Sequence, residues 1–253
     1  MNPKDRYIAV FDSGVGGISV LRELVRRMPE EHFLYYGDSA HAPYGTKPTQ
    51  QVRELTLRAA DHLYSQGIKA LVVACNTATA AAIQDLRERF PQIPVVGIEP
   101  ALKLAADEFP RGTVGIMATQ VTLREEKLAH QMERFPELAI HRIPAPGLVE
   151  LVEQGKGDSI ESRQLLRKIL TPYVGKLDAL VLGCTHYPFA EPAIREILGD
   201  GVHLLDGSEG TARQTLHLLQ EQGLTRQGSG SVTFQNSLQG QEILHLCQTL
   251  LNA

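Results

Sequence analysis

The chain contains 253 residues, of which 43% are hydrophobic and 21% charged, and its formal net charge at pH 7 is −4. That length accommodates one large domain or two of about 100–150 residues each. Because no long basic run is present, the sequence lacks the electrostatic signature of a nucleic-acid binder. It also lacks a run of about 18 apolar residues, so we expect no membrane-spanning helix.

The cysteine content and the N-terminal segment indicate the cellular compartment. The three cysteines are too few, and odd in number, for a disulfide framework. Residues 1–6 contain no apolar stretch before a small-residue cleavage site, so we expect no secretory signal. We therefore expect a cytoplasmic protein whose thiols remain free in a reducing environment.

Short apolar runs alternate with longer helical patterns along the chain. The expected strands are 7–11, 33–36, 69–74, 94–98, 113–117, 139–143, 178–183 and 202–205. The expected helices are 17–28, 49–66, 78–90, 121–134, 159–173, 189–198 and, in a C-terminal tail, about 208–222 and 240–251, with the linker-like stretch 227–231 between the last two. Strands that alternate with helices indicate parallel βαβ units, and strands rich in Val, Ile and Leu are typical of sheets covered on both faces. The sequence therefore predicts an α/β protein.

The strand pattern occurs twice, over residues 8–99 and again over 114–206. Cys75 follows the apolar run 70–74, and Cys184 follows the matching run 179–183. A duplicated scaffold of this kind can present one thiol from each half to a shared cleft. Two facing thiols suit a reaction that removes a proton from one face of a carbon and returns it to the other. The repeat therefore points to racemisation.

Polar residues follow four of the predicted strands directly. They are Asp12-Ser13, Cys75-Asn76-Thr77, Thr119 and Cys184-Thr185-His186. A single polar residue at such a position is often only a helix N-cap. In open α/β sheets, however, ligands bind outside the carboxyl ends of the strands, so the four groups together predict one site.

A glycine-rich turn, residues 12–17, follows the first predicted strand. The dinucleotide pattern G-x-G-x-x-G would require glycine at position 19, which is Ser19, and no phosphate-binding P-loop is present. We expect these glycines to let the backbone approach a small ligand, whose carboxylate the following amides would hold. The alternative is a purely structural turn. Asp12 ends an apolar strand, where an unpaired charge is costly.

The two repeat-matched cysteines carry most of the predicted chemistry. A helix N-terminus after each of them would lower the pKa of the thiol. Neither Cys75 nor Cys184 belongs to a Cys-x-x-Cys pair, so we expect no metal site. His186 is either structural or a group that orients and tunes the neighbouring thiol. Cys247 lies among leucines in the tail, and we expect it to pack in the core.

The chain resembles the glutamate racemases of the aspartate/glutamate racemase family over nearly its whole length. The motifs that carry the resemblance are Asp12-Ser13-Gly14-Val15-Gly16-Gly17, Pro43-Tyr44-Gly45, Cys75-Asn76-Thr77-Ala78 and Gly183-Cys184-Thr185-His186-Tyr187-Pro188. The resemblance implies two α/β domains with parallel sheets, related by pseudo-twofold symmetry, and no pyridoxal cofactor. It also implies a role in supplying D-glutamate for peptidoglycan. We expect residues 1–98 plus 208–253 to form the first domain and 99–207 the second, with the active site between them.

The resemblance also assigns roles to individual residues. It implies that Cys75 and Cys184 are the acid/base thiols, supported by Asp12, Glu153 and His186. The residues implied to bind substrate are Asp12, Ser13, Tyr44, Gly45, Asn76, Thr77, Thr119, Thr185 and His186. The supporting glutamate is either Glu153 or Glu150, which lies three residues earlier.

Two other functions remain open at this point. One is a related cofactor-independent racemase, such as an aspartate racemase, and the other is a non-catalytic module that binds an amino acid. Glutamate is the expected small-molecule partner, nucleic acid and membranes are not expected partners, and a homodimer is left open. No cofactor or metal is expected.

Overall fold

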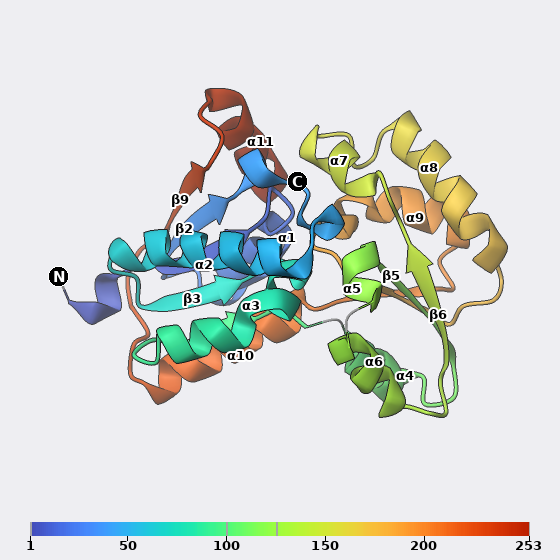
Figure 1. Ribbon diagram of the computed structural model, residues 1–253, viewed down its shortest axis with the longest axis horizontal. Coiled ribbons are helices and arrows are strands. Elements are labelled where there is room, and N and C mark those ends of the chain that lie inside the picture. Colours follow the sequence, from blue (N-terminus) through green and yellow to red (C-terminus); the bar gives the residue numbers. More distant parts are fainter. Residues whose placement is uncertain (1, 100, 125, 253) are drawn as a thin grey trace.

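The computed structural model describes residues 2–99, 101–124 and 126–252. Residues 1 and 253, the outer limits of the predicted first domain, lie outside this range. So do residue 100 of the predicted second domain and residue 125 within the predicted helix 121–134. Figure 1 shows two groups of strands side by side, each surrounded by helices.

A five-stranded parallel sheet forms the first α/β unit, in the order β4-β3-β1-β2-β9. Its strands are β1 (Ile8–Asp12), β2 (His32–Gly37), β3 (Ala70–Val73), β4 (Val95–Gly97) and β9 (Ser231–Asn236). Its helices are α1 (Ile18–Arg27), α2 (Thr49–Ser65), α3 (Asn76–Arg89), α10 (Ser208–Glu221) and α11 (Gln241–Asn252). Short 3-10 helices at Pro3–Asp5, Ser39–His41 and Tyr44–Thr46 complete this unit.

A four-stranded parallel sheet forms the second unit, in the order β6-β5-β7-β8. Its strands are β5 (Thr113–Ala118), β6 (Ala139–Pro144), β7 (Ala179–Leu182) and β8 (His203–Asp206). Its helices are α4 (Leu102–Glu108), α5 (Gln120–Arg124), α6 (Glu126–Glu133), α7 (Leu148–Glu153), α8 (Ile160–Leu170) and α9 (Glu191–Leu198), with 3-10 helices at Thr171–Tyr173 and Tyr187–Ala190. The predicted fold class, two α/β domains with parallel sheets, is confirmed.

The two sheets repeat the same strand order, with β1 matching β5 and β3 matching β7. Cys75 follows β3 and Cys184 follows β7, so the two thiols stand at equivalent strand ends. The carboxyl ends of parallel strands lie at one edge of a sheet, which is where such folds bind ligands. The internal repeat read from the sequence thus corresponds to a repeated structural unit.

Both faces of each sheet are covered, as the apolar composition of the strands predicts. Ile8 and Val10 of β1 enter one core, with α1, α10 and α11, whereas Ala9 and Phe11 enter a second core, with α2 and α3. This alternation follows from the twofold period of a strand. The second sheet is likewise covered by α7, α8 and α9 on one face and by α4, α5 and α6 on the other.

Three features of the fold differ from the sequence-based expectations. The tail contains a strand, β9, which pairs in parallel with β2, where only helices were expected. Two short helices, α4 and α7, were not expected at all. Expected helices 159–173 and 189–198 each divide into an α-helix and a 3-10 helix. Within the described residues, no helix is long and apolar enough to cross a membrane.

Candidate active site

Cys75 lies where β3 ends and α3 begins. Its Sγ contacts Ser13 Oγ at 3.5 Å and accepts a hydrogen bond from the amide of Ala78 at 3.4 Å. Burial and the nearby Asp12 carboxylate raise the pKa of Cys75 to about 12, although both hydrogen bonds oppose the change. The prediction that the helix N-terminus would lower the pKa of this thiol is therefore wrong, because burial outweighs it. At neutral pH Cys75 is a neutral thiol that can donate a proton.

Cys184 belongs to a buried chain of three ionisable groups. His186 Nδ1 lies 3.7 Å from Cys184 Sγ, and His186 Nε2 lies 2.6 Å from Glu153 Oε1. Burial by itself lowers the pKa of His186, but its hydrogen bonds to Cys184 and Glu153, and their charges, together raise it well above its usual range. An imidazolium donates from both ring nitrogens. His186 can therefore stabilise a thiolate on Cys184 while it is held by Glu153.

No α-helix begins directly after Cys184. The residues that follow it lead into the 3-10 helix Tyr187–Ala190 and only then into α9. The two thiols therefore occupy equivalent places in the fold but different electrostatic surroundings. Cys75 faces an amide and a hydroxyl, whereas Cys184 faces an imidazole.

Asp12 ties the two sheets together beneath the site. Its Oδ1 accepts from the amide of Gly14 at 2.9 Å, and its Oδ2 accepts from Thr185 Oγ1 at 3.0 Å. Burial raises the pKa of this carboxyl, and the charge of His186 opposes that shift. Ser19 Oγ donates to the carbonyl of Thr185 at 3.0 Å. Thr185, next to Cys184, is thus held through both its side chain and its backbone by the first unit.

The glycine-rich turn packs against side chains of the second unit. A Cβ on Gly14 would lie 1.8 Å from Glu153 Oε1, and a Cβ on Gly16 would lie 2.3 Å from His186 Nδ1. The amide of Val15 donates to Glu153 Oε1 at 2.7 Å. An amide of this turn does hold a carboxylate, but the carboxylate belongs to Glu153 and not to a small ligand. The glycines are required because Glu153 and His186 occupy the space of a side chain.

The two glutamates that the sequence left as alternatives lie in different places. Glu153 contacts His186 and Val15, as described above, whereas Glu150 is exposed and lines an adjoining cavity of about 230 Å³. The geometry thus places Glu153, rather than Glu150, against His186, the residue that contacts the Cys184 thiol. Gly147, with φ of 89°, precedes α7 and allows the turn that sets this helix in place.

A small cavity of about 20 Å³ brings both thiols together with most of the residues predicted to bind substrate. It is lined by Ser13, Pro43, Tyr44, Gly45, Cys75, Asn76, Thr77, Thr119, Val149, Cys184, Thr185 and His186. Asp12 and Glu153 do not line it but contact two residues that do, Thr185 and His186. Asn76 Oδ1 is buried without a hydrogen-bond partner among the described residues, so it is available to a bound ligand.

Several residues at the site were not predicted from the sequence. Val149 lines the cavity, and Thr122 Oγ1 lies 3.4 Å from Thr77 Oγ1 and 3.1 Å from Thr119 Oγ1. Ser39 Oγ contacts Glu153 Oε2 at 3.3 Å. None of them directly follows a predicted strand of the repeat, and none lies in a motif that carries the family resemblance. Cys247 is buried with α1 residues in the core, as expected, and lines neither of the cavities described above.

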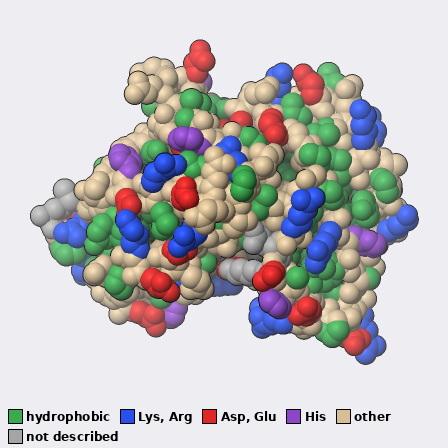
Figure 2. All heavy atoms as spheres, in the orientation of Figure 1, with side chains coloured by type: hydrophobic (Ala, Val, Ile, Leu, Met, Phe, Trp, Pro, Cys, Tyr) green, Lys and Arg blue, Asp and Glu red, His purple; other side chains and the backbone are tan. Residues whose placement is uncertain are grey.

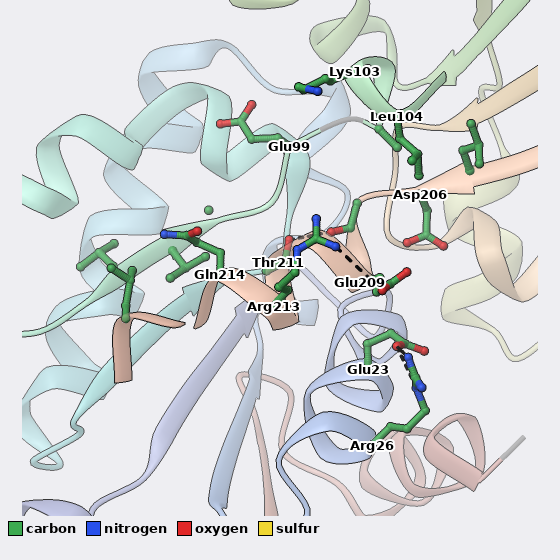
Figure 3. A pocket seen from close by; sticks show the side chains of 18 of the residues that line it. Glu23, Arg26, Glu99, Lys103, Leu104, Asp206, Glu209, Thr211, Arg213 and Gln214 are labelled. Atoms are coloured by element: carbon green, nitrogen blue, oxygen red, sulfur yellow. Dashed lines mark hydrogen bonds and ion pairs between the residues drawn. The ribbon is translucent and has the colours of Figure 1, made fainter. Parts of the chain in front are cut away.

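A second, much larger cavity of about 870 Å³ lies where the chain crosses between the two units. Figure 3 shows Glu99, Lys103 and Leu104 on one side and Asp206, Glu209 and Arg213 on another. Most of its charged side chains already have partners, such as Arg26 with Glu23. Neither thiol lines this larger cavity.

The surface shows mixed charge, and no metal-binding cluster is found among the described residues. Lys, Arg, Asp and Glu side chains are interspersed on the face seen in Figure 2, so neither sign of charge dominates it. Among the described residues, no group of three or more His, Cys, Asp or Glu side chains has the arrangement of a metal site.

Comparison with known proteins identifies the family. The sequence matches the Asp/Glu/Hydantoin racemase family over residues 9–215. The chain belongs to this family. It is 47% identical to the glutamate racemase of Clostridium acetobutylicum over 256 residues, covering 100% of both chains.

Two solved glutamate racemases have closely similar folds. The Escherichia coli enzyme, in complex with L-glutamate and the activator UDP-MurNAc-ala, is 31% identical, with a TM-score of 0.86 over 97% of this chain and 95% of that chain. The Francisella tularensis enzyme, in complex with D-glutamate, is 29% identical, with a TM-score of 0.85 over 99% of this chain and 95% of that chain. The resemblance inferred from the sequence motifs is confirmed.

Proposed function

We propose that this protein is an isomerase that interconverts L- and D-glutamate, with Cys75 and Cys184 as its two acid/base groups and without a pyridoxal cofactor. The observation that carries the proposal is that two thiols, from equivalent strand ends of two repeated units, line one small cavity. Glutamate as substrate is supported by the relatives, which are named glutamate racemases and have been solved with both enantiomers.

In this mechanism each thiol serves one face of the α-carbon. Cys184 removes the proton from L-glutamate, and Cys75 returns a proton to the opposite face to give D-glutamate. In the reverse direction Cys75 removes the proton and Cys184 returns it. The neutral thiol of Cys75 suits the donor role, and the contact between Cys184 and His186 suits the base.

The α-proton is weakly acidic, so its removal requires a large rate enhancement from the site. General acid–base catalysis contributes typically about 10²–10⁴-fold, so the rest must come from electrostatic stabilisation of the developing carbanion. In our proposal Asn76 Oδ1 accepts from the substrate ammonium, because it is a buried side-chain acceptor without a partner among the described residues. The hydroxyls of Ser13, Thr77, Thr119 and Thr185, with Gly45 and Tyr44, surround the carboxylates.

Access to the site requires the two units to separate. A cavity of about 20 Å³ holds about one water molecule and is too small for glutamate. We propose that residues 1–98 plus 208–253 move as one domain and 99–207 as the other, opening to admit substrate and closing around it. Closure would exclude water, which strengthens every electrostatic interaction within the site.

The cellular role follows from the reaction. We propose that the enzyme works in the cytoplasm and supplies D-glutamate for peptidoglycan synthesis, as the family resemblance implies.

Circular dichroism of purified protein mixed with L-glutamate tests this function. Racemisation should proceed after dialysis against a chelator and after treatment with hydroxylamine, which removes pyridoxal cofactors. Aspartate in a parallel assay separates an aspartate racemase from a glutamate racemase. Racemisation of neither amino acid would support a non-catalytic module and overturn the proposal.

Variants of the three cysteines test the assignment of roles. Cys75→Ala and Cys184→Ala should each abolish net racemisation, because each variant lacks the proton carrier for one face. Cys247→Ala is the matched control, since Cys247 is also buried but does not line the thiol cavity. Normal racemisation by either of the first two variants would contradict the mechanism.

A further inference from the structure

A continuous series of side-chain contacts runs from the C-terminal strand to one of the two thiols. Asn236 Nδ2 donates to Ser39 Oγ at 3.0 Å, and Ser39 Oγ donates to Glu153 Oε2 at 3.3 Å. The other oxygen of Glu153 contacts His186 at 2.6 Å, and His186 contacts Cys184 Sγ at 3.7 Å. One of these contacts joins each group in the series to the next.

The direction of these hydrogen bonds is fixed by the backbone. The amide of Leu238 donates to Asn236 Oδ1 at 2.9 Å, and because a backbone N–H can only donate, Nδ2 must face Ser39. The Ser39 hydroxyl accepts from that amide, and its own proton is directed at Glu153. Three donors from different parts of the chain, Val15 N, Ser39 Oγ and His186 Nε2, therefore converge on one carboxylate.

The members of this series come from distant parts of the chain. Asn236 is the last residue of β9 and pairs in register with Gly37 at the end of β2. It lies beyond residues 9–215, the part of the chain that matches the racemase family. Glu153 ends α7 in the other unit, and its neighbour Val152 is buried in the core that α1 and α11 share. Figure 1 shows α7 and α11 next to each other.

We infer that Ser39 and Asn236 are positioning residues for Cys184. They hold the Glu153 carboxylate from the first unit, so that Glu153 holds His186 in the orientation in which the imidazole stabilises the Cys184 thiolate. No hydrogen bond among the described residues joins Cys75 to this series, because its Sγ is hydrogen-bonded to Ser13 and Ala78. The inference rests on the proposed function and assigns these two residues to one of its two proton transfers.

Loss of Ser39 or Asn236 should therefore slow only one step of the reaction, the proton transfer at Cys184. L- and D-glutamate have equal free energies, so kcat/KM must remain equal in the two directions for every variant. A slower proton transfer at Cys184 therefore cannot appear as a directional difference in kcat/KM. It appears instead in the isotope effects, because Cys184 removes the α-proton of L-glutamate and Cys75 removes that of D-glutamate.

The test measures α-deuterium isotope effects on kcat/KM for both enantiomers in wild-type protein and in Ser39→Ala. We expect kcat/KM of the variant to fall about tenfold, the size expected for a lost hydrogen bond to a charged group at a partly exposed site. The isotope effect should rise for L-glutamate and fall for D-glutamate, because the Cys184 step now limits the rate. Damage to the whole fold would lower the rate without moving the two isotope effects in opposite directions.

Further variants keep the test independent of any one substitution. Asn236→Ala should shift both isotope effects in the same directions as Ser39→Ala, with a fall in kcat/KM of about threefold, and should add nothing when combined with it. Ser39→Thr keeps the hydroxyl and should restore the wild-type values. Ser237→Ala is the matched control, because Ser237 Oγ joins the same tail to the same loop, by accepting from the amide of Ala40, without touching Glu153.

The outcomes separate this inference from the proposed function. Unchanged isotope effects in Ser39→Ala and Asn236→Ala, whatever their rates, would overturn the positioning role while leaving glutamate racemisation intact. The same opposite shifts in Ser237→Ala would also overturn it. Wild-type protein that does not racemise glutamate would overturn the proposed function itself.

Discussion

Gly14 and Glu153 meet across the boundary between the two repeated units, where a Cβ on residue 14 would lie 1.8 Å from Glu153 Oε1. The glycine-rich turn after β1 is therefore shaped to receive a side chain from the opposite unit. Because that side chain contacts His186, which in turn contacts Cys184, the turn would support the proposed proton transfer without contributing an acid or a base.

The Gly14→Ala variant should have kcat/KM reduced at least tenfold. The added methyl group would displace Glu153 from Val15 and His186, leaving the imidazole without its carboxylate partner. Steady-state racemisation kinetics give the comparison. The matched control is Gly210→Ala in α10, where an added Cβ meets open space; this variant should keep full activity and gain about 0.5–1 kcal/mol in stability from helix propensity.

The Thr185→Val variant should lose about 1–3 kcal/mol of free energy of unfolding, because Asp12 Oδ2 would be left buried without its donor. Thr185→Ser keeps the hydroxyl and should lose less. Urea unfolding of the three proteins measures the difference. Equal stability of the Val variant and the wild type would show that the Thr185–Asp12 hydrogen bond does not join the two units as described.

The stability of the protein should fall as pH rises above the ordinary pKa of histidine. The pKa of His186 in the folded protein is raised well above 6.5, so above that pH the folded state holds a proton that the unfolded state has lost. The stabilisation from this group is fully present below the unfolded pKa and is lost as pH rises through the folded pKa. Urea unfolding between about pH 6 and pH 9 should show a steeper decline for wild type than for His186→Asn. Parallel curves would contradict the assignment of a charged His186.

The amide of Val15 should exchange its hydrogen more slowly when D-glutamate saturates the protein. In the closed arrangement this amide donates to Glu153 Oε1 at 2.7 Å, and opening of the two units to admit substrate would break that bond. Hydrogen–deuterium exchange with and without D-glutamate measures the effect. The amide of Val72 in β3, which lies between β1 and β4 in the first sheet, should be unaffected. Equal exchange of Val15 in both conditions would argue against opening at this boundary.

The sequence predicted the sheets well because their strands are buried on both faces. The expected bounds of eight strands agree with the observed bounds to within about one residue. Parallel strands that are buried on both faces appear in the sequence as short runs of Val, Ile and Leu. The ninth, β9, was missed because it is a half-buried edge strand with an alternating pattern, placed after a Gly- and Ser-rich stretch. The short helices α4 and α7 contain too few turns for a periodic pattern to identify them.

The sequence predicted those site residues that a local pattern can identify. Polar residues after strand ends identified most of the groups that line the thiol cavity, because strand ends meet at one edge of a sheet, whereas Tyr44 and Gly45 were assigned from the family motifs. The partner of the glycine-rich turn was not predicted, since Gly14 and Glu153 are distant in sequence and meet only through the packing of two units. Ser39 and Asn236 were not predicted for the same reason, because their proposed role depends on where Glu153 lies. The raised pKa of Cys75 also depends on its burial, which local sequence does not give.

The fate of the α-proton in heavy water tests the central claim, that two thiols act on opposite faces of the α-carbon. Wild-type protein is mixed with L-glutamate in D₂O, and both enantiomers are analysed for α-deuterium during the first few per cent of conversion. The two-thiol mechanism predicts that D-glutamate carries deuterium from its first appearance, while the remaining L-glutamate keeps its original proton, because the group that donates to the new face is not the one that took the proton. Early D-glutamate that retains the original proton would show that a single group serves both faces, and would contradict the assignment of Cys75 and Cys184.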